Sequence, residues 1–243
     1  MRSIQVKRSI AKRALLCAIA LLPTGGAAMA ENLLRNPGFE SVPGSTTGQG
    51  LMPNDWVVVL TTPDTYSNDG SYGLLPSFLG NFSGVSASEG LRWVAGWSVA
   101  NERFGQTLTT PLVAGVSYRL TGRLHQSVRS DLNHEGGYQL QLALPGQTSG
   151  TTLTTIGPTT GTGNWEPFDV SFEAPSDASS RPLLIFDPVS NTPGSGVYPG
   201  VDDLVLEPLV PPLPALRTPL LAMLLFAMLL LGVRGASRAR IRG

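Results

Sequence analysis

The region between residues 31 and 208 shows no sustained helical periodicity, and this feature most constrains the fold. Short runs rich in Val, Leu, Thr, Tyr, Phe and Trp recur there between clusters of Gly, Pro, Asn, Asp and Ser. This pattern is typical of an all-β sandwich. Strands are expected at 56–60, 90–94, 104–109, 117–125, 138–144, 152–156, 168–172, 183–186 and 201–206. The region has no interior linker or internal repeat, which predicts a single domain over 31–208.

Residues 1–30 have the three-part form of a secretory signal peptide. Five basic residues lie between positions 2 and 13, Ala14–Leu22 is a short apolar core, and Ala28-Met29-Ala30 is a small-x-small cleavage site. The apolar core is shorter than the roughly 20 residues that a bilayer span requires. We therefore expect this segment to be removed before Glu31.

A second special segment, 209–243, contains a proline-containing linker, an apolar run and a basic tail. Val210-Pro211-Pro212-Leu213-Pro214 precedes the uninterrupted apolar run Leu220–Val233, and four arginines follow between 234 and 242. The run predicts a transmembrane helix at about 219–233, with its cationic end in the cytoplasm. This order resembles the carboxy-terminal sorting signals of the PEP-CTERM and IPTL-CTERM class, which exosortases process in Gram-negative bacteria. The resemblance implies an exported protein, anchored in the membrane and then placed at the cell surface or in the extracellular matrix.

The formal net charge of zero conceals an uneven distribution of charge. All 17 acidic residues lie between 31 and 207, whereas that region has seven arginines and no lysine. The expected mature body is therefore strongly acidic, which argues against a nucleic-acid partner. Cys17, the only cysteine, lies in the predicted signal peptide, so the mature body is expected to contain no disulfide.

Alternation of polar and apolar residues predicts the faces of two central strands. In 117–125, Tyr118, Leu120 and Leu124 are expected to point inward, and in 138–144 the residues Leu140, Leu142 and Leu144 do the same. If these two strands pair, the remaining polar side chains share one exposed sheet face; these are Arg119, Arg123, His125, Gln139 and Gln141. Such a face is either plain solvated surface or a platform whose planar groups hydrogen-bond sugar hydroxyls.

Several motifs resemble the galactose-binding-like jelly rolls of the carbohydrate-binding-module type. They occur in family order, as Asn32-Leu33-Leu34-Arg35-Asn36-Pro37-Gly38-Phe39-Glu40, Pro53-Asn54-Asp55-Trp56, Ala114-Gly115-Val116-Ser117-Tyr118-Arg119-Leu120, Asn164-Trp165-Glu166-Pro167-Phe168 and Val201-Asp202-Asp203-Leu204. The resemblance implies a single jelly-roll β-sandwich in which the first and last segments lie side by side.

The same resemblance implies a structural calcium ion. Its ligands would be Glu40 and one of the two adjacent aspartates, Asp202 or Asp203. Calcium prefers six to eight oxygen ligands, and a cation that joins both ends of a domain stabilises it. The alternative is that Glu40 caps a turn and both aspartates are solvated.

Two aromatic residues are candidates for ligand contact. Trp97 follows Trp93 at a spacing that places both indoles on one side of an extended segment, and Tyr72 lies in a Gly-rich loop. Exposed aromatic rings stack well on the CH faces of sugars. Trp56 and Trp165 match core positions of the family, so we expect them to pack rather than bind.

The sequence contains no recognised catalytic motif. Asp131-Leu132-Asn133-His134-Glu135 has acid, base and metal-binding residue types, but it lacks a spacing such as His-Glu-x-x-His and resembles a polar turn. We therefore expect a non-enzymatic surface protein that binds a glycan or exopolysaccharide through Tyr72, Trp97, Arg123, His125, Gln139 and Gln141. A structural matrix protein without a ligand is the alternative, and a glycan hydrolase, which needs two carboxylates across a cleft, is the third.

Overall fold

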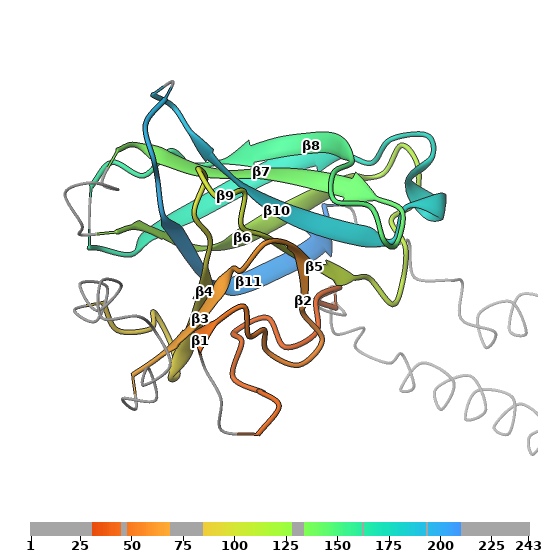
Figure 1. Cartoon of the computed structure of the whole chain (residues 1–243). Coiled ribbons are helices and arrows are strands. Elements are labelled where there is room, and N and C mark those ends of the chain that lie inside the picture. Colours follow the sequence, from red (N-terminus) through yellow and green to blue (C-terminus); the bar gives the residue numbers. More distant parts are fainter. Residues whose placement is uncertain are drawn as a thin grey trace, which may run out of the picture. The chain divides into compact units, whose positions relative to one another are not determined.

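The chain forms two antiparallel β-sheets that face each other. The computed structural model describes residues 31–44, 48–68, 85–127, 134–161, 163–192 and 194–209. In spatial order, the first sheet contains β1 (Gly48–Gln49), β3 (Asp64–Ser67), β4 (Arg92–Ala95), β11 (Pro199–Pro208), β6 (Ser117–Gln126) and β9 (Glu166–Glu173). The second contains β2 (Val57–Leu60), β5 (Arg103–Thr107), β10 (Leu183–Ser190), β7 (Gly136–Ala143) and β8 (Thr151–Ile156). Figure 1 shows the two layers, so the expected all-β sandwich is confirmed.

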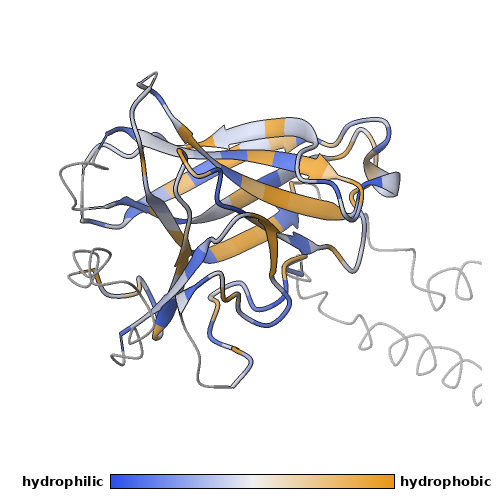
Figure 2. Ribbon diagram, in the orientation of Figure 1, coloured by the Kyte–Doolittle hydropathy of each residue, from blue (hydrophilic) through white to orange (hydrophobic). Residues whose placement is uncertain are grey.

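The main core lies between the sheets and is filled by alternate residues of their strands. Tyr118, Leu120 and Leu124 of β6 are buried there, as are Leu140 and Leu142 of β7. Figure 2 shows apolar and polar residues alternating along β7, as expected for a strand with one face in the core. The expected inward direction of Leu144 is wrong, because this residue lies beyond β7 and is 40% exposed.

The first and last segments of the described domain lie side by side. Leu33 donates its backbone N–H to the carbonyl oxygen of Leu206 at 2.9 Å. The Asn32 side chain also binds the backbone of the last strand: Nδ2 donates to Leu204 O at 2.9 Å, and Oδ1 accepts the N–H of Leu206 at 3.0 Å. The expected closure of the domain by its two ends is therefore confirmed.

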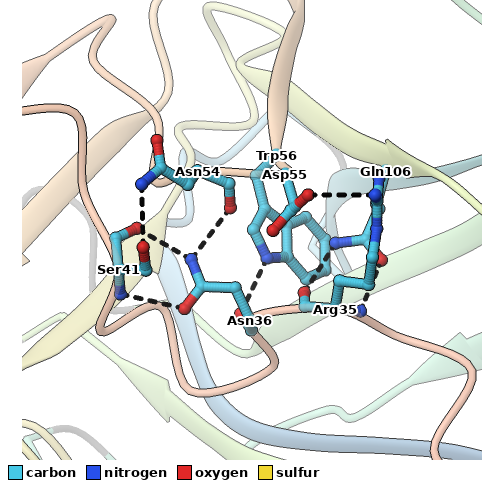
Figure 3. A network of polar contacts seen from close by, with 7 residues as sticks. All are labelled: Arg35, Asn36, Ser41, Asn54, Asp55, Trp56 and Gln106. Carbon is cyan, nitrogen blue, oxygen red and sulfur yellow. Dashed lines mark hydrogen bonds and ion pairs between the residues drawn. The ribbon is translucent and has the colours of Figure 1, made fainter.

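The N-terminal motif is held in place by a network of hydrogen bonds (Figure 3). The Asn36 side chain donates to the carbonyl oxygens of Ser41 and Asn54, both at 2.8 Å, and accepts the N–H of Ser41 at 3.0 Å. Trp56 donates its indole N–H to Asn36 O at 2.9 Å. Gln106 exchanges two 2.8 Å hydrogen bonds with the Arg35 backbone, which fixes the motif to β5. Buried amide groups are satisfied in this way, and Trp56 packs in the core as expected.

The 117–125 and 138–144 strands do not pair with each other, so the condition for a shared polar face is not met. β6 pairs with β11 and β9, whereas β7 pairs with β10 and β8 in the other sheet. Alternation specifies which side chains face the core, but it does not specify the neighbouring strand. Two short strands, β1 and β3, were also not expected from the sequence. The predicted signal peptide and the predicted membrane helix lie outside the described residues. Within the residues that are described, no helix has the length and apolar character to cross a membrane.

Candidate functional site

A second buried cluster lies on the face of the first sheet that points away from the main core. Tyr66 of β3 and Trp93 of β4 are register partners, and both are buried outside the main core. Their neighbours in register, Thr65 and Val94, point the other way, and Val94 belongs to the main core. We call the second cluster the acid–aromatic cluster; it consists of Asp64, Tyr66, Trp93, Glu102, His125 and Tyr198.

Glycine at position 200 allows the aromatic part of this cluster to form. His125 of β6 is opposite Gly200 of β11, and a Cβ atom at residue 200 would lie 2.4 Å from His125 Nε2 and 2.7 Å from Trp93 Cζ3. The two rings therefore meet edge to face over the glycine, with centroids 4.5 Å apart. On its other side Trp93 stacks on Tyr66, with centroids 4.2 Å apart and planes inclined by 13°.

Asp64, Tyr198 and Tyr66 form, in this order, a continuous chain of side-chain hydrogen bonds. Tyr198 donates its hydroxyl to Asp64 Oδ2, and the hydroxyls of Tyr198 and Tyr66 are 2.9 Å apart. Asp64 is 1% exposed, and its Oδ1 atom has no hydrogen-bond partner among the described residues. Burial raises the pKa of Asp64 to about 7, although the Tyr198 hydrogen bond opposes the shift.

Glu102 is a second buried carboxyl in the cluster. Its Oε2 atom accepts the backbone N–H of Trp97 at 2.7 Å, and its Oε1 atom accepts the hydroxyl of Thr62 at 3.3 Å. Burial, followed by the nearby charge of Asp64, raises the pKa of Glu102 to about 8, and the two hydrogen bonds oppose that rise. Two acids that hold their protons near neutral pH are therefore placed in one cluster, which is a common feature of acid–base sites.

His125 is the only imidazole in this cluster. It lies edge to face against Trp165 as well as Trp93, with a centroid distance of 4.4 Å to Trp165. Burial lowers the pKa of His125 to about 4, against the opposing effect of the Gln126 backbone. At neutral pH the ring is therefore uncharged and acts as an aromatic packing group.

The comparison with known protein families identifies the chain. A sequence model described as HpiC1-like, HpiC1 cyclase, matches residues 31–185, which is more than half of the chain. The chain belongs to the HpiC1-like family. Of the acid–aromatic cluster, only Tyr198 lies outside the matched stretch. No curated protein sequence matches the chain.

Solved structures with a similar fold include both cyclases and carbohydrate-binding modules. A cyclase from Fischerella sp. TAU in complex with 4-(1H-indol-3-yl)butan-2-one is 19% identical, with a TM-score of 0.46, over 75% of this chain and 100% of that chain. The CBM22-1 xylan-binding domain of Paenibacillus barcinonensis Xyn10C is 12% identical, with a TM-score of 0.44, over 77% and 100%. TmCBM61 in complex with beta-1,4-galactotriose is 18% identical, with a TM-score of 0.40, over 74% and 99%.

Membership of the HpiC1-like family corrects the functional expectation from the sequence. A non-catalytic carbohydrate-binding protein was expected, and the family match points instead to a cyclase-type enzyme. The expectation that the chain is not an enzyme is wrong for the same reason. The sequence motifs correctly indicated a sandwich, but a sandwich hosts both binding and catalysis, so the motifs did not determine the function.

The five predicted ligand-binding residues that the structure describes are not gathered on one exposed face. Arg123 is exposed on β6, whereas His125, two residues further on, is completely buried. Gln139 and Gln141 lie on β7 in the other sheet, where Gln141 bonds Gln139 Oε1 and Asp187 Oδ2, both at 2.9 Å. Trp97 is half-buried beside the acid–aromatic cluster, and Tyr72 lies outside the described residues. These side chains therefore do not form the one exposed sheet face that pairing of the two strands would have given. Ligand contact by the individual residues stays a prediction.

The predicted metal ligands lie in one region, around segment 85–91. Glu40 Oε1 accepts the backbone N–H groups of Leu91 and Arg92 at 2.7 and 2.9 Å. Asp202 is buried and accepts three backbone N–H groups, two of them at Oδ2 from Ser88 and Glu89. Burial raises the pKa of Asp202 to about 7, and the backbone hydrogen bonds lower it. In the part of the chain that the structure describes, no group of three His, Cys, Asp or Glu side chains is arranged to hold a metal ion.

Asp203 is in a different environment from Asp202. Burial raises its pKa, and so do a hydrogen bond and the negative charge of Glu89; the positive charge of Arg123 opposes this rise, and the charge of Glu40 makes the smallest contribution to it. Its backbone has a positive φ of 56°, at the point where the pairing of β11 with β6 shifts register. Glu89, Glu40 and the guanidinium of Arg123 therefore all lie near enough to act on the Asp203 carboxyl, whereas the oxygens of Asp202 are occupied by N–H donors.

Sequence reasoning did not find Asp64, Tyr66, Glu102 or Tyr198. The period-two pattern of Asp64-Thr65-Tyr66-Ser67 offers one weak signal for a strand, but three of these four side chains are polar. All four residues of β3, Asp64–Ser67, are nevertheless buried, because both faces of this strand are covered. The His134 segment, which was considered for catalysis, gives an exposed histidine at the start of β7, and Asp131 lies outside the described residues.

Proposed function

We propose that this protein is a cyclase-type enzyme whose reaction centre is the acid–aromatic cluster. Membership of the HpiC1-like family over residues 31–185 carries this proposal. The chemistry of the cluster supports it, because a ring closure promoted by acid needs a proton donor and an environment that tolerates positive charge. Asp64 supplies the donor, and the aromatic rings of Tyr66 and Trp93 supply the environment.

Asp64 suits the role of general acid because burial keeps much of it protonated near neutral pH. Tyr198 donates to Oδ2, so that the other oxygen, Oδ1, is the atom that carries a transferable proton. The proton moves from Oδ1 to a basic atom of the substrate, and Asp64 becomes a carboxylate that the Tyr198 hydroxyl continues to stabilise. The proton returns to Asp64 when the ring has closed, so the enzyme is regenerated without a co-reactant.

Turnover of neutral indoles that carry an alkene tests the function. Indoles are chosen because an indolyl ketone is bound in the Fischerella cyclase structure. The protein is expected to convert at least one member of such a panel into a cyclic isomer of unchanged mass, detected by chromatography and mass spectrometry. Replacement Asp64→Asn is expected to lower the rate about 100-fold or more, whereas Asp169→Asn, at an exposed carboxylate of β9, is expected to leave it unchanged. Equal rates in the Asp64→Asn variant and the wild type would remove Asp64 from the mechanism, and a folded protein that converts no member counts against cyclase activity.

We also propose that the enzyme is exported and delivered to the cell envelope. The signal-like segment 1–30 and the sorting-signal order of 209–243 support this proposal, with the membrane and an exosortase-type enzyme as partners. The fold is compatible with cleavage before Glu31, because Asn32 is the first of the described residues that hydrogen-bonds the last strand. Mass spectrometry of the mature protein is expected to find Glu31 at its N-terminus.

A calcium ion near Glu40 and Asp203 remains a proposal about stability. The charges of Glu89 and Glu40 raise the pKa of Asp203 against the opposing charge of Arg123, and this supports the proposal, since a bound cation would favour the ionised carboxylates. The carboxylates alone do not complete a site, so loop carbonyl oxygens would have to contribute. Addition of a chelator is expected to lower the melting temperature of the wild type but not that of the Asp203→Asn variant. A wild-type melting temperature that does not respond to chelator would end this proposal.

A further inference from the structure

We propose that residues 85–90 form a lid over the acid–aromatic cluster, and that Trp165 holds this lid closed through the carbonyl oxygen of Ser86. The inference rests on the proposed cyclase function, because it names the route by which a substrate reaches that site. Neither the family match nor the similar structures assign a role to this segment.

All six residues of the acid–aromatic cluster are closed off from solvent. Trp93 and His125 are completely buried, and the most exposed member, Glu102, is only 4% exposed. An indole-sized substrate therefore cannot reach Asp64 unless a neighbouring segment moves aside, as lids do in many enzymes. That segment must lie on the outer side of the first sheet, because the inner side faces the main core.

Residues 85–90 lie directly against the cluster on this outer side. Val85 is buried and belongs to the same group of packed side chains as Tyr66 and Trp93. Ala87 packs against that group as well. Displacement of the lid would therefore uncover the aromatic part of the cluster.

Trp165 joins the lid to the cluster. Its ring lies edge to face against Trp93, with centroids 5.7 Å apart, as well as against His125. Its indole N–H donates to Ser86 O at 2.7 Å. The same side chain thus covers the imidazole and binds the lid, so that opening of the lid also loosens the cover over His125.

Side chains from distant parts of the chain supply the other hydrogen bonds of the lid. Asn68 Oδ1 accepts the backbone N–H of Ala87 at 2.8 Å. Asp202 Oδ2 accepts the N–H groups of the next two residues at 2.9 and 3.2 Å. Among the described residues, no backbone-to-backbone hydrogen bond holds 85–90 in place. Such a segment can open locally, because no strand pairing has to be broken.

The turn at 96–102 is a second segment beside the cluster, and it is held differently. Gly96 donates its backbone N–H to Pro199 O at 3.3 Å, and Ser98 donates its own to Val197 O at 3.0 Å. These backbone bonds extend the pairing of β4 with β11. The turn is therefore fixed to the sheet, whereas the lid is held by side chains, and we expect the lid to be the segment that moves.

Labelling of a thiol placed in the cluster measures how often the lid opens. Ala95 is completely buried in the same group of side chains as Val85 and Trp93, so Ala95→Cys puts a small reporter beneath the lid. The full-length protein also carries Cys17→Ser, which makes the reporter its only thiol. Iodoacetamide is the probe, and the labelling rate is measured under native conditions.

Variants of the lid and of the turn are compared in this background. Trp165→Phe removes the hydrogen bond to Ser86 but keeps an aromatic ring, and Asn68→Ala removes the hydrogen bond to Ala87. Each is expected to raise the labelling rate about two- to tenfold, as the loss of one hydrogen bond allows. Ser98→Ala is the matched control, because it also removes one side-chain-to-backbone hydrogen bond, at 3.0 Å from the Val197 N–H, and is expected to leave the rate unchanged.

Hydrogen exchange of the unsubstituted protein tests the lid independently of these variants. The backbone N–H groups of residues 87–89 are expected to exchange about tenfold or more faster than those of residues 96 and 98 in the turn. Equal or slower exchange in the lid overturns the proposal, whether or not the Ala95→Cys protein folds. Labelling rates that do not respond to Trp165→Phe or Asn68→Ala, or that respond equally to Ser98→Ala, overturn it as well.

Neither measurement needs a substrate, so failure of the lid and failure of the proposed function are distinguishable. A lid that opens as expected, together with no isomerised product from the indole panel, keeps the lid and counts against the cyclase function. Turnover that depends on Asp64, together with a lid that fails the tests above, keeps the cyclase and overturns the lid.

Discussion

Replacement of Asp64 by asparagine is expected to remove a large part of the pH dependence of stability. An asparagine resembles the protonated acid, since its amide oxygen can accept from Tyr198 while its NH₂ group occupies the place of protonated Oδ1. The variant is therefore expected to fold and to carry no charge at this position at any pH.

The sign and size of the effect follow from the raised pKa of Asp64. In the folded protein the pKa is about 7, against an ordinary value of 3.8, so the folded state binds the proton more tightly than the unfolded state. This stabilisation is fully present below pH 3.8 and is lost as the pH rises through about 7. Between pH 5 and pH 8 the loss for a single group with this shift is about 3 kcal/mol.

Urea unfolding at pH 5 and pH 8 measures this loss in wild type and in Asp64→Asn. The free energy of unfolding of the variant minus that of wild type is expected to be about 3 kcal/mol higher at pH 8 than at pH 5, because only wild type loses stability over this range. Asp169→Asn is the control, because the pKa of Asp169 is lowered by Arg119 and the group is ionised throughout this range. Parallel curves for wild type and Asp64→Asn would show that Asp64 is not a buried, uncharged acid, and would refute the reasoning.

Two further predictions concern the aromatic part of the cluster. Because burial lowers the pKa of His125 from 6.5 to about 4, the contribution of this group to stability is present above pH 6.5 and is lost as the pH falls through about 4. Between pH 7 and pH 5 this group is expected to lower the free energy of unfolding of wild type by about 2 kcal/mol, and urea unfolding of His125→Leu is expected not to show that decrease. A variant whose pH dependence equals that of wild type would contradict a buried neutral imidazole. Gly200→Ala is expected to destabilise the fold by roughly 1–3 kcal/mol, because its methyl group overlaps His125 and Trp93. Gly38→Ala, where a Cβ has no neighbour within 4 Å, is the matched control, and equal melting temperatures for the two variants would contradict this packing.

The sequence allowed the sandwich to be predicted because most strands have one face in the main core. Leu120, Leu124, Leu140 and Leu142 show this plainly, since each alternates with polar residues and each is buried. β3 could not be found in this way, because its buried residues include Asp64 and Ser67, and burial there depends on a second layer of aromatic residues.

The same second layer explains why the environment of His125 was not predicted. His125 was expected on an exposed face, because it follows the polar period of β6. Trp165 and Trp93 cover that face of the strand, and the imidazole is buried between them. Local alternation cannot reveal such a cover, since the covering residues are far away in the sequence. Glu102 and Asp64, which lie 38 positions apart, become neighbours only through the packing of β3, β4 and the turn after β4.

The position of β11 determines the order in which this protein can assemble. The last strand in the chain, Pro199–Pro208, lies between β4 and β6 (Figure 1). Until residue 208 has been synthesised, no complete strand joins the β1-β3-β4 half of the sheet to the β6-β9 half by backbone hydrogen bonds, and Asn32 lacks its hydrogen-bond partner in the last strand. Contacts over such long sequence separations form slowly. The first sheet therefore cannot be completed until nearly all of the domain has been made.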